Sequence, residues 1–152
     1  MLEIGKKKVL AQNLTDRIKM QLGDSEALHY EDNSFAAVTV AFGVRNFENL
    51  DKGLLEIFRV LKPKGTLVIL ETAVPKNYFL KTFYMLYTQN IMPFIGKLFS
   101  KDRSAYKYLS DSAAAFPHGE VFNNILRKNG FIEVEDLPQT LGIASIYFAK
   151  KA

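Results

Sequence analysis

The chain has 152 residues, of which 48% are hydrophobic and 24% are charged, and its formal net charge is +4. This length suits a single domain, residues 1–152, that buries a core, and the composition is typical of a globular protein. Because the sequence has no cysteine and only two histidines, it excludes disulfides and thiolate chemistry and argues against a metal site, and the mild charge argues against nucleic-acid binding.

The first part of the chain predicts a helix and a short strand. Residues 1–13 divide into an apolar stripe and a basic stripe, which is typical of a helix. Residues 18–22 alternate apolar and polar side chains, which predicts a strand. The polar segment GDSEAL, residues 23–28, comes next, and an acidic residue directly after a strand marks the carboxyl edge of a sheet.

The centre of the chain has a strand–helix–strand pattern. Residues 35–42 are apolar, rich in valine and uncharged, which is typical of a parallel strand buried on both faces. An amphipathic helix over 54–61 follows, the sequence LKPKG ends it, and a second apolar strand, 66–70, leads to Glu71. Such a crossover joins parallel strands, and ligands bind beyond the carboxyl ends of parallel strands. We therefore expect the functional residues just after these two strands.

An aromatic segment, residues 76–112, follows the second strand. Pro93 and Gly96 predict two helices within it. Its aromatic side chains favour a substrate lid that covers a lipid-like molecule or touches a membrane surface, and the alternative interpretation is ordinary core packing. The longest uncharged apolar stretch, residues 82–96, is shorter than the roughly 20 residues of a membrane span.

The end of the chain predicts a helix and an antiparallel strand pair. Residues 120–129 form the helix, with Val121, Phe122, Ile125 and Leu126 expected to face inward. The strands 131–136 and 143–149 are separated by Pro138 and Gly142, which favours a hairpin.

Several motifs resemble those of the C-methyltransferases of ubiquinone and menaquinone biosynthesis. They are GDSEAL, DNSF, AFGVRNFENL, RVLKPKGTLVILE, KDRSAYKYL, AFPHGEVF and GIASIY, and they cover essentially the whole chain. The most specific is RV-x-KP-x-G before an apolar strand and a glutamate, and GIASIY favours the menaquinone side. The resemblance implies an α/β, Rossmann-like class I methyltransferase fold with a C-terminal antiparallel strand pair.

The same resemblance implies a function. The cofactor would be S-adenosylmethionine, and the substrate a demethylmenaquinone-type quinol, that is, a polyprenyl naphthoquinol methylated on a ring carbon. The enzyme would be cytoplasmic, with peripheral contact at the inner face of the membrane. An alternative within the same fold is a methyltransferase for a sterol or another small molecule.

The chain departs from the family pattern in its first part. No G-x-G stands ahead of Asp24, and Ala36, Lys64 and Ala73 stand where the family usually has aspartate, glycine and serine. We therefore expect an N-terminally truncated domain with impaired activity and an unpaired strand edge, which predicts a homo-oligomer. The alternative function is a non-catalytic, self-associating fragment.

The resemblance also implies cofactor-binding residues. Asp24 and Ser25 would recognise adenine, because a carboxylate accepts a hydrogen bond from its amino group. Ala41, at the end of the central strand, would contact the cofactor through its main chain. The alternatives are that Asp24 caps its loop and that Ala41 is an ordinary strand residue.

Arg45 and Asn46 are the candidate catalytic pair, and the resemblance implies that they orient a water molecule or the quinol oxygen. The arginine would stabilise a developing phenolate without acting as the base. The alternative is that Arg45 pairs with a surface carboxylate and Asn46 caps a turn. His118 could act as a base, but we favour an exposed loop histidine. For Glu71, a structural hydrogen-bonding role and a catalytic role both stay open.

Overall fold

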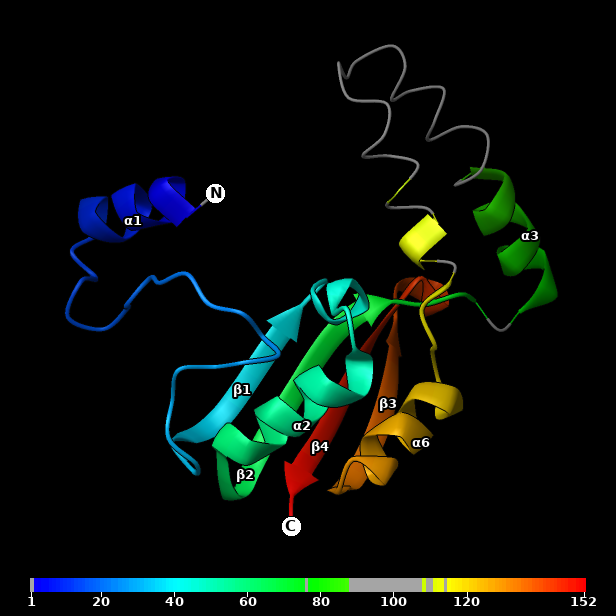
Figure 1. The fold of residues 1–152 in the computed structure, drawn as a ribbon. Helices are drawn as coiled ribbons and strands as arrows, with labels where there is room; N and C mark the ends of the chain where they lie inside the picture. Colours follow the sequence, from blue (N-terminus) through cyan, green and yellow to red (C-terminus); the bar gives the residue numbers. More distant parts are fainter. Residues whose placement is uncertain (1, 76, 88–107, 109–110, 114) are drawn as a thin grey trace.

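A computed structural model describes every residue except 1, 76, 88–107, 109–110 and 114, and its centre is a four-stranded sheet (Figure 1). The strands lie in the order β1-β2-β4-β3. Their bounds are Phe35–Ala41 for β1, Leu61–Thr72 for β2, Phe131–Gln139 for β3 and Ala144–Lys151 for β4. β1 and β2 are parallel, and β4 runs antiparallel to both β2 and β3. The predicted crossover and C-terminal hairpin are therefore confirmed.

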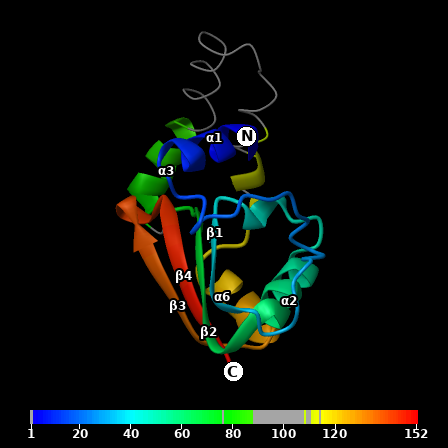
Figure 2. The ribbon, with the colours of Figure 1, turned by 90° about the vertical axis from the view of Figure 1, so that its left-hand side faces the viewer.

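Helices cover one face of the sheet. The described helices are α1 (Leu2–Ala11), α2 (Leu50–Val60), α3 (Tyr78–Leu86) and α6 (Glu120–Lys128). Figure 2 shows α2 and α6 on one side of the sheet, while α1 and α3 lie beyond its upper end. The opposite face carries no helix from the described residues, so its strand side chains are only partly covered.

The core lies between the sheet and its two covering helices. On this face the cross-strand pairs Leu67–Ala149 and Ile69–Tyr147 are buried. The helices contribute the fully or almost fully buried Leu54, Ile57, Phe122 and Leu126. Burying such side chains stabilises the fold by about 1.5–3 kcal/mol each.

The C-terminal end of α6 is tied to the first turn of α2. Asp51 accepts hydrogen bonds from Lys128 Nζ at 2.8 Å and from Asn129 Nδ2 at 2.7 Å. Both contacts lower the pKa of Asp51, and the hydrogen bond from Asn129 has the larger effect. The negative charge also lies in the first turn of α2, where the helix dipole favours it.

Two predictions about local structure are wrong. Residues 18–22 form no strand, and Ile18, Met20 and Leu22 are all exposed, because the alternation there has no described strand to pair with. Val121 is 62% exposed, since the inward face of α6 passes through Phe122 and Leu126 instead.

The central strand β1 is buried on one face only, so the prediction of burial on both faces is also wrong. Val38 and Val40 pack against the core, whereas Ala37, Thr39 and Ala41 are exposed on the face that lacks a helix. Within the described residues, β1 pairs with β2 alone, which leaves its outer edge without a strand partner.

Candidate active site

Arg45 forms a buried ion pair at the carboxyl edge of the sheet. It belongs to a short 3-10 turn, Val44–Asn46, that begins two residues after β1 ends, and its Nη1 donates to Glu71 Oε1 at 2.5 Å. The Arg45 side chain is 9% exposed and that of Glu71 is fully buried. The alternative interpretation, a surface carboxylate as the partner, does not hold: the partner is the buried glutamate at the end of β2.

The pair retains hydrogen-bonding capacity that the described residues do not use. Glu71 Oε1 also accepts from the main-chain N–H of Thr72 at 2.8 Å. By contrast, Arg45 Nε and Glu71 Oε2 are buried and have no hydrogen-bond partner among the described residues. Buried polar atoms are rarely left unpaired, and such exceptions cluster at functional sites. The pair is thus both a structural link between β1 and β2 and a candidate for contact with a ligand.

Asn46 and two tyrosines lie at the same edge of the sheet as this pair. Asn46 is exposed, and its Oδ1 accepts a hydrogen bond from Tyr108 Oη at 2.9 Å. Burial raises the pKa of Tyr84 in α3, and the positive charge of Arg45 opposes that rise. The charge of Arg45 therefore acts on Tyr84, which indicates that α3 and the 3-10 turn lie at the same edge of the sheet.

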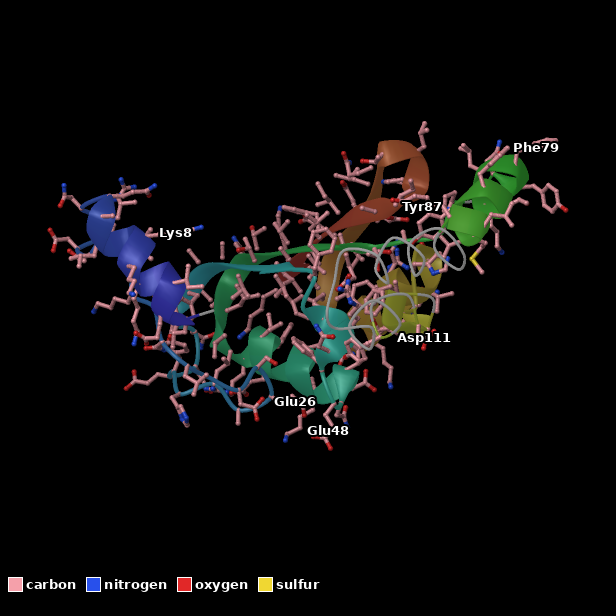
Figure 3. All side chains as sticks on the ribbon, turned by 90° about the horizontal axis from the view of Figure 1, so that it is seen from above. Lys8, Glu26, Glu48, Phe79, Tyr87 and Asp111 are labelled. Carbon is pink, nitrogen blue, oxygen red and sulfur yellow. The ribbon has the colours of Figure 1, made fainter. Side chains whose placement is uncertain are left out.

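Asp24 and Ser25 lie in a tight turn that is tied to α2. Asp24 is exposed, and its Oδ1 accepts from the main-chain N–H of Glu26 at 2.9 Å, so Asp24 does cap its loop. Glu26 in turn accepts from the N–H of Asn49, the N-cap of α2, at 2.8 Å. Figure 3 shows Glu26 beside Glu48 at this end of α2. The turn therefore lies near the segment that carries Arg45 and Asn46.

Ala41 ends β1 at the same edge and is exposed. The next residue, Phe42, has a φ of 52° and is 45% exposed, and its N–H donates to Leu70 O at 2.8 Å. The chain thus leaves the sheet abruptly at this residue. None of the hydrogen bonds within the described part of the chain joins Ala41 to Asp24.

A second polar group lies farther along the same edge. His118 is half-buried in the loop before α6, so the expectation of an exposed loop histidine is wrong. Asp136 accepts a hydrogen bond from Ser145 Oγ, and both line the same pocket as His118. No local sequence pattern predicts this group, because His118, Asp136 and Ser145 belong to different elements and come together only in the folded chain.

The described residues give no sign of a metal site or a membrane span. They contain no group of three histidine, aspartate or glutamate side chains that could hold a metal ion. None of the helices in this part of the chain has the length and hydropathy that crossing a bilayer requires.

Comparison with known proteins identifies the family of the chain. The model of the "ubiE/COQ5 methyltransferase family" matches residues 1–151. The chain belongs to this family. It is 45% identical over 151 residues to a demethylmenaquinone methyltransferase of Bacteroides fragilis, covering 99% of the chain and 62% of that relative. It is 43% identical over 151 residues to the ubiquinone/menaquinone biosynthesis C-methyltransferase UbiE of Geotalea daltonii, covering 99% of the chain and 64% of the relative.

The fold agrees with this membership. A crystal structure of a SAM-dependent methyltransferase from Aquifex aeolicus superimposes with a TM-score of 0.65 at 14% identity, covering 99% of this chain and 63% of that one. The chain therefore has the Rossmann-like class I methyltransferase fold implied by its motifs. As a member of the ubiE/COQ5 family, it spans less than two thirds of the length of these two relatives.

Proposed function

We propose that the chain takes part in S-adenosylmethionine-dependent C-methylation of a demethylmenaquinone-type quinol. The observation that carries this proposal is the buried Arg45–Glu71 pair at the carboxyl edge, with Asn46 in the same turn. A fixed arginine at this edge is suited to an oxygen that gains negative charge. The relatives named for demethylmenaquinone and for ubiquinone/menaquinone methylation support the same substrate class.

The residues of the chain supply orientation and charge. Glu71 holds the guanidinium of Arg45 in one position, so its remaining donors are preorganised for the quinol oxygen. Transfer of the hydroxyl proton to a water molecule at this edge would leave an electron pair on that oxygen, which makes the adjacent ring carbon nucleophilic, and Arg45 would stabilise the phenolate. Because Asn46 Oδ1 accepts from Tyr108, its amide N–H groups are available to donate to the same oxygen or to a water molecule.

The residues at the edge fit the adenine end of the cofactor. Asp24 is exposed, and the N–H of Glu26 orients one of its carboxylate oxygens. Ser25 lies beside it, and Ala41 is exposed at the end of β1. Bound S-adenosylmethionine would supply an electrophilic methyl group, and these residues would only hold and orient it.

We further propose that α3 contacts the lipid-like part of the substrate at the cytoplasmic surface of the membrane. Tyr78, Phe79 and Phe83 are 77%, 73% and 71% exposed, and Figure 3 shows Phe79 projecting from the outer end of α3. Exposed aromatic residues on a helix are typical of lipid contact. Part of the expected lid, residues 88–107, lies outside the described residues.

Vesicles test this contact. The chain should sediment with anionic phospholipid vesicles, and the double variant Phe79→Ser/Phe83→Ser should lose most of this binding. Val121→Ser is the matched control, because Val121 is 62% exposed on α6, a helix outside the lid segment. Equal sedimentation of the double variant and the control would contradict the role of α3.

We also propose that the chain self-associates through β1. Its outer edge has no partner among the described strands, and Thr39 is exposed on the uncovered face. Such edges attract a second strand, most simply in a symmetric dimer. Gel filtration with light scattering should give a dimer at micromolar concentration, which Thr39→Lys should disrupt and the control Val121→Lys should not. A monodisperse monomer with a cooperative thermal transition would contradict the proposal.

Methyl transfer tests the central proposal. The chain is joined to the part of the Bacteroides fragilis relative that it does not cover, and transfer from radiolabelled S-adenosylmethionine to a reduced short-chain demethylmenaquinone is measured. Arg45→Ala should lower kcat about 10²–10³-fold with little change in cofactor affinity. Arg127→Ala, which removes an exposed arginine of α6, is the control. Normal turnover of Arg45→Ala would show that Arg45 is only structural.

If the unsubstituted fusion methylates a sterol or another phenol and not the demethylmenaquinone, the substrate part of the proposal is wrong. If it binds S-adenosylmethionine but transfers no methyl group to any of these acceptors, the catalytic part is wrong.

A further inference from the structure

The first turn of α2 has only half of a capping box. Asn49, the N-cap of α2, accepts a hydrogen bond through Oδ1 from the main-chain N–H of Lys52 at 3.0 Å. In a complete capping box, the residue at the position of Lys52 is a glutamate or glutamine that accepts a hydrogen bond from the N–H of the N-cap residue. A lysine side chain has no acceptor, so the helix itself cannot supply the second half.

Glu26 supplies this second half from a different segment. Its Oε1 accepts from the main-chain N–H of Asn49 at 2.8 Å, across 23 positions of sequence. Its Oε2 lies 3.8 Å from Nζ of Lys52, and the Glu26 side chain is only 10% exposed. The negative charge also lies at the N-terminal end of α2, where the helix dipole favours it. Glu26 therefore attaches the turn that contains Asp24 and Ser25 to the start of α2.

The main chain of Glu26 orients Asp24. Its N–H donates to Asp24 Oδ1 at 2.9 Å. The N–H of Ala27 donates to the main-chain oxygen of Asp24 at 3.2 Å, so two hydrogen bonds close the turn. Together they fix the direction of the exposed carboxylate that would accept from the amino group of adenine.

Glu26 also sets this turn against the candidate catalytic pair. Asn49 follows Asn46 by three positions, and three residues span at most roughly 10–11 Å even when fully extended. Glu26 is bonded to Asn49 through its side chain and to Asp24 through its main chain. It therefore limits the distance between the candidate adenine site and the turn that carries Asn46.

We propose that Glu26 is a positioning residue for the cofactor, acting through Asp24 and contacting neither the cofactor nor the quinol. The inference rests on the proposed function and adds the residue that holds the adenine site in place. The carboxylate of Glu26 is already engaged with Asn49 and Lys52. Loss of this acceptor releases the Asp24 turn from α2, which lowers the affinity for the cofactor and leaves the rate of methyl transfer from bound cofactor unchanged.

The fold should tolerate a change at Glu26, because the same segment has a second attachment to α2. Glu56 Oε1 accepts from the main-chain N–H of Leu28 at 2.8 Å, and Arg59 Nη2 donates to the main-chain oxygen of Leu28 at 3.1 Å. Arg59 Nη1 also donates to the main-chain oxygen of Tyr30 at 2.8 Å. None of these contacts involves Glu26, so its replacement should affect only the turn 24–27.

Calorimetry with S-adenosylmethionine, in the absence of an acceptor, tests the inference on the fusion protein described above. Glu26→Ala should raise the Kd about tenfold, because a hydrogen bond to a charged acceptor is lost. Glu26→Gln keeps an oxygen that can accept from Asn49 and should keep most of the affinity. Glu48→Ala is the matched control, because Glu48 is an exposed carboxylate beside Glu26 at the same end of α2 (Figure 3), and it should leave the Kd unchanged.

Three further measurements separate positioning from a merely structural role. At saturating cofactor, Glu26→Ala should keep the kcat of the unsubstituted fusion. Combined with Asp24→Ala, it should cause little further loss of affinity, since a residue that acts through Asp24 then has nothing left to position. In the chain without the fusion, the amide of Asn49 should exchange its hydrogen faster in Glu26→Ala than in Glu26→Gln.

Several results would overturn the inference. One is an equal Kd for Glu26→Ala and Glu48→Ala. Another is full additivity of the losses caused by Asp24→Ala and Glu26→Ala, which would show that Glu26 acts independently of Asp24. A fall in kcat without a rise in Kd, or equal exchange of the Asn49 amide in the alanine and glutamine variants, would overturn it as well.

The two proposals fail separately. Methyl transfer by the fusion protein with a Kd that Glu26→Ala does not change would leave the proposed function standing and overturn the positioning role. A Kd that depends on Glu26 as expected, in a fusion that transfers no methyl group to any acceptor, would support the positioning role and overturn the proposed reaction.

Discussion

Replacing Arg45 by alanine should destabilise the fold strongly, because it leaves a buried carboxylate without its cation. Arg45 Nη1 lies 2.5 Å from Glu71 Oε1, and the Glu71 side chain is fully buried. Removing one partner of a buried ion pair costs about 3–5 kcal/mol, out of a total stability of about 5–15 kcal/mol. For a chain of this size, that loss lowers Tm by about 6–20 °C.

The exposed ion pair of α6 provides a matched control. Arg127 Nη1 also lies 2.5 Å from a glutamate oxygen, that of Glu120, but the two side chains are 44% and 65% exposed. An exposed pair contributes only about 0–1 kcal/mol. Arg127→Ala should therefore change stability little, although it removes an arginine–glutamate contact of the same length.

Urea unfolding followed by circular dichroism measures both variants. The double replacement Arg45→Met/Glu71→Leu should recover most of the loss, because a buried ion pair exchanged for apolar side chains is often neutral or stabilising. The reasoning would be refuted if Arg45→Ala cost no more than Arg127→Ala. It would also be refuted if the double replacement were as unstable as Arg45→Ala, since burial of an unpaired charge would then not be the cause.

Three further outcomes follow from the structure and the sequence. Gly53→Ala in α2 should destabilise the chain by about 1–3 kcal/mol, because a Cβ there would lie 2.3 Å from the ring of Phe47. Gly23→Ala is the control, because a Cβ at Gly23 would have no atom within 4 Å. Equal urea midpoints for the two variants would contradict this. Asp51→Asn should reduce the loss of stability on acidification. Because the pKa of Asp51 is lowered in the folded state, its carboxylate stabilises the fold above the unfolded pKa of 3.8, and this stabilisation is lost as the pH falls through the folded pKa. An unchanged dependence of the free energy of unfolding on pH between about pH 5 and pH 2 would refute this. Calorimetry of the chain with S-adenosylmethionine should show binding much weaker than micromolar, because no G-x-G precedes Asp24, and a sub-micromolar Kd would contradict this.

The sequence predicted those parts of the fold that short-range patterns encode. The β1–α2–β2 crossover, α6 and the β3–β4 hairpin each follow from periodicity and from turn residues within a few positions. The insertion of β4 between β2 and β3 depends on pairing between distant segments, and no local pattern specifies it. The same limit explains β1, whose apolar composition permits burial on both faces without showing which partners are present.

The site was predicted in part for the same reason. Arg45 and Asn46 follow a strand in a parallel crossover, so their place at the carboxyl edge could be predicted. The partner of Arg45 could not, because Glu71 is 26 positions away and only the parallel pairing of β1 with β2 brings the two together. His118 looked like an isolated loop residue until the hairpin placed Asp136 and Ser145 in its pocket.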